Sequence, residues 1–150
     1  MVNFSLEAYE VNIIPKQSLI HTTEAKWIWL IGAIRSGKSA GGLVEGIMAS
    51  LDYAGNRGLV TRWEYSVLEK TTMSTFFELV PRDSGYVRKW QDVKHRLELV
   101  NGSEILFMEG KEYYKFRGLE LGFYIIDQAE EFPTPAAMET LDGRLNKPNV

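Results

Sequence analysis

The sequence contains no cysteine among its 150 residues. Disulfide bonds and thiolate metal sites are therefore excluded, and the fold must depend on side-chain packing. No apolar run approaches the roughly 20 residues that a membrane-spanning helix needs, and the N-terminal residues Met1 to Ser5 lack the basic and apolar regions of a signal peptide. From these absences we expect an intracellular protein without membrane contact.

The chain also lacks internal repeats, low-complexity tracts and linkers rich in proline, glycine or serine, which predicts a single domain over residues 1–150. Its net charge of -3 argues against a surface that binds nucleic acid everywhere. One basic cluster surrounds Trp90 and His95 and consists of Arg88, Lys89, Lys94 and Arg96. We interpret it as alternating charge on a solvated strand pair, with contact to a phosphate backbone as the alternative.

The most informative segment that is present runs from Gly32 to Ser39 and matches the phosphate-binding pattern G-x-x-x-x-G-K-S/T. The glycines let backbone N–H groups turn toward an anion, and the helix that follows adds its positive N-terminal end. Lys38 is then expected to reach the β- and γ-phosphates, and Ser39 to supply a hydroxyl oxygen to Mg²⁺. A glycine-rich turn that only caps a helix would leave both residues unexplained. We therefore assign nucleotide binding to Gly32, Ser36, Gly37, Lys38 and Ser39.

Apolar patterns around the loop predict an α/β fold, a P-loop NTPase with a mainly parallel central sheet flanked by helices, of the additional-strand type. The continuous apolar run Trp27 to Ile31 predicts a strand covered on both faces. Apolar residues at helical spacing predict a helix from Ala40 to Leu51, and the sequence then favours a strand from Gly58 to Thr61. A second helix is expected from Glu64 to Val80, where Pro81 ends it.

An antiparallel hairpin is predicted around residues 95–108, because Arg96 to Val100 and Glu104 to Met108 flank the dipeptide Asn101-Gly102. This dipeptide favours a two-residue turn in which both residues have positive φ. We expect the hairpin to serve as scaffold, with direct DNA contact as the alternative.

A second nucleotide motif lies at Phe123 to Asp127, four apolar or aromatic residues that end in a carboxylate. In P-loop enzymes an acid at this position secures the magnesium, so we assign Asp127 to the metal. Hydrolysis also needs a base, and Gln128 cannot accept a proton. If the chain stays extended, Glu130 projects on the same side as Gln128, and we favour it as the base. Glu131 is the competitor if a helical turn begins at once, and two solvated acids near a helix N-terminus are the third possibility.

Taken together, the chain resembles the ATPase domain of the large terminase subunit of tailed bacteriophages, the motor that packages DNA into a procapsid. The resemblance covers nearly the whole chain. Its specific part is the combination of the loop and Asp127 with Pro15-Lys16-Gln17 upstream and Phe116-Arg117-Gly118 before the acidic motif. Thr61-Arg62, Asn101-Gly102-Ser103 and the segment from Asp127 to Phe132 match as well.

The resemblance implies roles for three further residues. Gln17 would bind the adenine. The alternative is that it is a surface glutamine that caps a helix. Arg117 would stabilise charge on the transferring phosphate, often in the neighbouring subunit, where pairing with Glu112 or Glu120 is the alternative. Arg35, inside the loop, would sense the γ-phosphate.

The resemblance also implies ATP and Mg²⁺ as cofactors, and double-stranded DNA, the portal protein and the small terminase subunit as partners. It implies a ring of subunits in the host cytoplasm, transiently at the portal vertex of the procapsid.

Two departures from the family pattern affect these expectations: Gln128 stands where the family more often has Glu, and the chain stops at Val150. The threonine-rich coupling motif and the nuclease domain of the family would then be absent. In this ATPase class the coupling strand lies between the loop strand and the Asp127 strand, so we expect a gap in the centre of the sheet and weak hydrolysis. The alternatives are a non-catalytic module derived from a terminase, or another P-loop ATPase such as a helicase, which the absence of a DExH or DEAD acid cluster disfavours.

Overall fold

The computed structural model describes residues 15–33 and 35–146, except for the side chains of residues 15–18. Its five strands form one sheet in the order β2-β3-β4-β1-β5. β1 is parallel to both of its neighbours, β4 and β5, whereas β3 is antiparallel to β2 and β4. The bounds are Arg57–Arg62 for β1, Val87–Gln91 for β2, Arg96–Leu99 for β3, Glu104–Glu109 for β4 and Phe123–Ile126 for β5.

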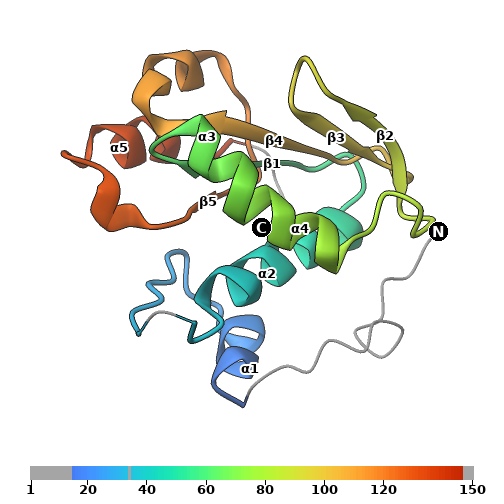
Figure 1. The fold of residues 1–150 in the computed structure, drawn as a ribbon, viewed down its shortest axis with the longest axis horizontal. Coiled ribbons are helices and arrows are strands. Elements are labelled where there is room, and N and C mark those ends of the chain that lie inside the picture. The colour runs from blue at the N-terminus through green and yellow to red at the C-terminus, as the bar shows by residue number, and fades with distance from the viewer. Residues whose placement is uncertain (1–14, 34, 147–150) are drawn as a thin grey trace.

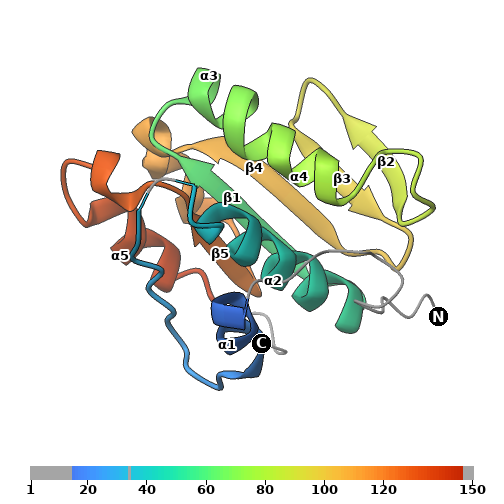
Figure 2. The same ribbon diagram turned by 60° about the horizontal axis from the view of Figure 1, so that its bottom comes forward.

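Helices cover both faces of this sheet (Figures 1 and 2). One face carries α2 (Lys38–Asp52) and the helical segment α3 (Tyr65–Val67), η1 (Leu68–Met73) and α4 (Ser74–Leu79). The other face carries the 3-10 helix η2 (Gly110–Gly118) and α5 (Ala136–Asp142). The helix α1 (Pro15–Thr22) packs against α2, and the short turn η3 (Ala129–Glu131) follows β5. None of the helices in the described part of the chain is long and apolar enough to cross a membrane.

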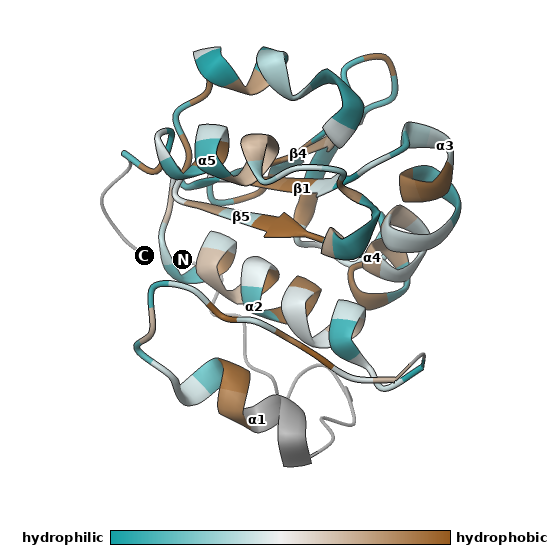
Figure 3. Ribbon diagram, turned by 90° about the vertical axis from the view of Figure 1, so that its left-hand side faces the viewer, coloured by the Kyte–Doolittle hydropathy of each residue, from teal (hydrophilic) through white to brown (hydrophobic). Residues whose placement is uncertain are grey.

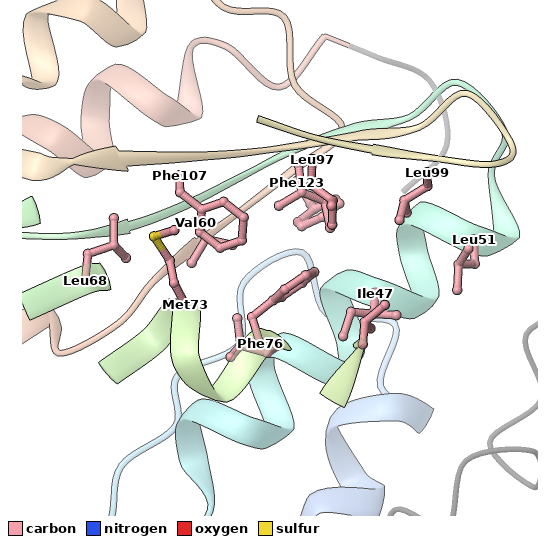
Figure 4. Packing of buried hydrophobic residues seen from close by; sticks show 13 residues of the cluster. Ile47, Leu51, Val60, Leu68, Met73, Phe76, Leu97, Leu99, Phe107 and Phe123 are labelled. Atoms are coloured by element: carbon pink, nitrogen blue, oxygen red, sulfur yellow. The ribbon is translucent and has the colours of Figure 1, made fainter. Parts of the chain in front are cut away.

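Side-chain alternation along β1 divides the core into two clusters, because successive residues of a strand point to opposite faces. Val60 belongs to the cluster beneath α2 and α4, and Leu59 to the cluster beneath η2 and α5. Figure 4 shows the first cluster between the helices and the sheet, and the ring centroids of Phe76 and Phe107 within it lie 5.2 Å apart.

Several predicted elements are confirmed. α2, β1 and β5 lie where the apolar spacing placed them, and the helix expected from Glu64 to Val80 appears as Tyr65–Leu79. The interior of that helix is a π-helix, Leu68–Met73, which the apolar spacing did not indicate. The outer strand β2, which carries Arg88 and Lys89, pairs antiparallel with β3, which carries Arg96, so the strand pair expected for the charged cluster is present.

The turn between β3 and β4 differs from the predicted one. Its Gly102 N–H donates to the Leu99 carbonyl at 3.0 Å, and the Leu99 N–H donates to the Ser103 carbonyl at 2.8 Å. Gly102 has φ 84, but Asn101 is not among the residues with positive φ. The expectation of two positive φ values is wrong because the connection is longer than two residues, so a single glycine is enough to turn the chain.

The strand expected at Trp27 to Ile31 is also wrong. This segment has no strand assignment, and Trp29 and Ile31 are 65% and 94% exposed. In Figure 3 the hydrophobic run appears as a brown stretch alongside α2, outside the sheet. The run has the composition of a covered strand, but a strand also needs a hydrogen-bonding neighbour. The run pairs with none of the five strands: β5, at this end of the sheet, pairs with β1 and not with residues 27–31.

Candidate functional site

The loop before α2 is shaped by two residues in left-handed conformations. Arg35 has φ 63, and Gly37, the residue just before α2, has φ 80. The Lys38 ammonium turns back over the loop, where it donates to the carbonyl of Gly32 at 2.5 Å and to that of Ala33 at 2.7 Å. A positive charge is therefore held inside the curve of the loop, beside the N-terminus of a 15-residue helix.

Ser36 and Gly32 complete this curve. The Ser36 hydroxyl lies 3.3 Å from the Lys38 ammonium. A Cβ atom at position 32 would lie 3.1 Å from the Ser36 hydroxyl oxygen and 3.8 Å from the Lys38 Cδ, so a larger residue would crowd the ammonium. Glycine thus lets the lysine fold close to the backbone.

The carboxylate of Asp127 meets the first turn of α2. Its Oδ1 accepts a hydrogen bond from the Ser39 hydroxyl at 2.8 Å, and its Oδ2 accepts one from the Thr72 hydroxyl at 2.6 Å. The Asp127 N–H donates to the Thr61 carbonyl at 2.9 Å and so continues the pairing of β5 with β1. The parallel strands therefore deliver the acid to the same edge of the sheet as the loop.

The donors at this edge suit Mg²⁺, which prefers hard oxygen ligands and usually retains several waters. A hydroxyl oxygen and a carboxylate oxygen lie 2.8 Å apart at Ser39 and Asp127. Within the described residues no group of three or more His, Asp or Glu side chains could hold a metal. The hydroxyl and carboxylate oxygens at this edge are therefore chemically suited to a magnesium ion.

The chain does not stay extended after Asp127. Gln128 adopts a left-handed conformation with φ 54, and the 3-10 turn Ala129–Glu131 begins at the next residue. Both carboxylate oxygens of Glu131 accept from Arg62, at 2.7 and 3.2 Å, and this hydrogen-bonded carboxylate raises the pKa of the Arg62 guanidinium. Glu130 is exposed and has no hydrogen bond or ion pair to any residue of the described chain. Glu130 was favoured on the expectation of an extended chain after Asp127, and this expectation is wrong. Glu131 was its competitor if a helical turn began at once, but both of its carboxylate oxygens already accept hydrogen bonds from Arg62.

Arg117 lies away from the loop of its own chain. It is exposed near the end of η2, and its carbonyl accepts from the Arg144 guanidinium at 2.7 Å. The end of η2 precedes β5 in the chain and Asp127 follows it, so the four residues of this strand lie between them. A strand of four residues spans about 13 Å. In the described part of the chain Arg117 forms no ion pair with Glu112 or Glu120; Glu112 pairs with Lys115 instead. Gln17 falls within α1, but its side chain lies outside the described residues.

The basic cluster near Trp90 is partly neutralised. Arg96 forms ion pairs with Glu98 at 3.3 Å and Glu104 at 3.5 Å. Arg88 and Lys89 are exposed on β2, the outer strand at the end of the sheet opposite β5. The cluster therefore belongs to a charged strand surface remote from the loop.

Two residues at the site had no predicted role, Thr72 and Arg62. One sequence signal points to Thr72: it lies four residues from Leu68 and from Phe76, so a polar side chain occupies the apolar stripe of a helix. All three side chains are buried in the structure. A polar group in such a stripe needs a hydrogen-bonding partner, and here the partner is Asp127.

The fold is that of the ATPase domains of bacteriophage large terminases. The Thermus phage P74-26 large terminase ATPase domain superposes with a TM-score of 0.68 at 22% identity, over 86% of this chain and 58% of that domain. The large terminase of a second, thermophilic bacteriophage superposes with a TM-score of 0.67 at 15% identity, over 78% of this chain and 30% of that protein. The same thermophilic phage protein in complex with ADP gives a TM-score of 0.66.

This chain thus spans about three fifths of the first neighbour and under a third of the second. No protein-family model matches the sequence, and no curated protein matches it significantly.

Proposed function

We propose that this chain is an ATP-binding and ATP-hydrolysing domain of a viral DNA-packaging motor, a terminase large subunit. The observation that carries the proposal is the contact between the first turn of α2 and the end of β5, where the Ser39 hydroxyl lies 2.8 Å from Asp127. The likeness to terminase ATPase domains, one of them within a protein solved with ADP, supports the choice of nucleotide and of motor.

In the proposed site the backbone of the loop and the Lys38 ammonium bind the triphosphate. Asp127 and Ser39 hold the metal side, and bound magnesium neutralises charge that develops on the phosphates. Glu130 accepts the proton of the attacking water, because Arg62 occupies both oxygens of Glu131, whereas the Glu130 carboxylate accepts no hydrogen bond from the described part of the chain.

Arg117 acts on the ATP of a neighbouring subunit, since β5 separates it from the loop of its own chain. This role requires a ring of subunits around double-stranded DNA, with the portal protein and the small terminase subunit as the other partners. Gln17 binds the adenine and Arg35 senses the γ-phosphate.

Nucleotide binding tests the site directly. Titration of the chain with a fluorescent ATP analogue and Mg²⁺ is compared between the natural protein and Lys38→Ala. Removal of a hydrogen-bonded charge costs about 1.5–3 kcal/mol, which is about a 10- to 150-fold loss of affinity. Lys89→Ala on the remote strand β2 removes the same charge and is expected to leave the affinity unchanged. Equal affinities for the two variants would refute the site assignment.

A second function, nucleotide binding without hydrolysis, is favoured by one observation: the segment leading into the loop lies outside the sheet, with Trp29 65% exposed. The loop then lacks the strand that would hold it rigidly. Phosphate release measured with and without double-stranded DNA separates the two functions. Binding that depends on Lys38, without phosphate release in either condition, would establish the non-catalytic module.

A further inference from the structure

We infer that Thr72 is a positioning residue for the metal-side carboxylate, and that the π-helical turn Leu68–Met73 carries its hydroxyl to Asp127. The inference rests on the proposed function, because the metal concerned is that of the proposed nucleotide site.

The contact itself fixes the carboxylate from both sides. Thr72 is 1% exposed, and its hydroxyl donates to Asp127 Oδ2 at 2.6 Å, while Ser39 donates to Oδ1 at 2.8 Å. With both oxygens engaged, the carboxylate cannot turn about its terminal bond without breaking a hydrogen bond. Oδ1 is therefore kept toward the hydroxyl that begins α2.

The helix that supplies this hydroxyl is anchored in the core. Leu68, Met73 and Phe76 are all buried, and they lie on either side of Thr72 in the sequence (Figure 4). The hydroxyl is therefore held before any ligand binds, as a positioning group requires.

The π-helical turn links the same helix to the second acid. Thr71, next to Thr72, accepts a hydrogen bond from Arg62 at 2.9 Å, and Arg62 in turn holds Glu131. Of these consecutive threonines, Thr72 contacts Asp127 directly and Thr71 contacts Glu131 through Arg62. Such single wide turns inside helices are frequent at functional sites.

The expected consequence concerns the metal rather than the phosphates. Groups that orient a metal ligand without touching the metal typically contribute 10- to 100-fold to metal affinity. Loss of the Thr72 hydroxyl should therefore raise the Mg²⁺ concentration needed for tight nucleotide binding, while binding in the presence of a chelator should not change. A purely structural threonine would lower the unfolding temperature and leave the Mg²⁺ requirement alone.

The experiment measures the affinity for a fluorescent ADP analogue over a series of Mg²⁺ concentrations and in EDTA, together with thermal unfolding without nucleotide. Thr72→Val removes the hydroxyl at nearly constant volume, and Thr72→Ser retains it. Thr61→Val is the matched control, since Thr61 is equally buried but its hydroxyl faces the Arg62 carbonyl at 3.5 Å.

We expect Thr72→Val to raise the Mg²⁺ requirement about 10- to 100-fold, and Thr72→Ser and Thr61→Val to keep the natural requirement. If Thr72→Val does not fold, Thr72→Ala is judged by the same measurement. Mg²⁺-dependent binding in the natural protein, combined with the same requirement in the valine or alanine variant, would overturn the role of Thr72. Binding that depends on neither Mg²⁺ nor Lys38 would instead overturn the proposed function.

Discussion

Replacement of Gly58 by alanine should destabilise the protein through the strand that carries Asp127. Gly58 of β1 is paired with Phe123 of β5, and the aromatic ring fills the space beside the glycine. A Cβ atom at position 58 would lie 2.0 to 2.5 Å from three atoms of that ring. Across the ring lies α2, where a Cβ atom at Gly46 would be 2.9 Å from Phe123 Cε2. The ring therefore occupies a slot between β1 and α2 that exists only because both residues are glycine.

The magnitude follows from two opposing effects. Phe123 is 9% exposed, so the displaced ring has little open space, and overpacking of this kind costs about 1–3 kcal/mol. Alanine also returns some of the strand stability that glycine lacks, about 0.5–1 kcal/mol. The middle of each range leaves a net loss of about 1 kcal/mol, or about 2–4 °C in unfolding temperature for a chain of this size.

Thermal unfolding followed by circular dichroism measures this change. Gly118→Ala is the matched control, because a Cβ atom there would have no atom within 4 Å, and its stability should change by less than about 0.5 kcal/mol. Phe123→Leu should cost less in the Gly58→Ala background than in the natural protein, because the smaller side chain relieves the clash. Equal unfolding temperatures for Gly58→Ala and Gly118→Ala would refute the claim that the Phe123 ring needs a glycine at position 58.

Two further predictions concern the acids and a half-buried phenol. Glu130→Gln should lower the rate of ATP hydrolysis about 10²- to 10⁴-fold without a change in nucleotide affinity. Glu131→Gln should mainly lower the unfolding temperature, because it weakens the ion pair with Arg62. Phosphate-release and melting assays measure both effects, and the reverse pattern would assign the base to Glu131. Burial raises the pKa of Tyr124 above its ordinary value of 10.0, and the hydrogen bond to Asp142 raises it further. The unfolded chain then loses this proton first, so the stabilisation is fully present below about pH 10 and is lost as the pH rises toward the folded pKa. Tyr124→Phe should accordingly reduce the loss of unfolding free energy between about pH 9 and pH 11 in urea titrations, and equal losses in both proteins would contradict this assignment.

Much of the backbone could be predicted from local patterns. The helical spacing after Ser39 predicted α2, and the apolar run that ends at Asp127 predicted β5, because burial on one or both faces leaves a period in the sequence. The pattern expected of a phosphate-binding loop is likewise present in the sequence, since two glycines, a lysine and a hydroxyl occur within eight consecutive residues, and its role in nucleotide binding stays a prediction.

Pairing between distant residues was not predictable in this way. Trp27 to Ile31 has the composition of a buried strand, yet a strand also needs a hydrogen-bonded neighbour, and this run pairs with none of the five strands of the sheet. The Thr72 contact joins residues 55 positions apart, and the Arg62 pair with Glu131 joins residues 69 apart. Periodicity reports which side of an element is buried, but it does not report what the buried atoms touch. Residue types and spacing therefore predicted the loop and the acid, whereas the packing of the helix Tyr65–Leu79 on the sheet selected the side chains that hold the acid in place.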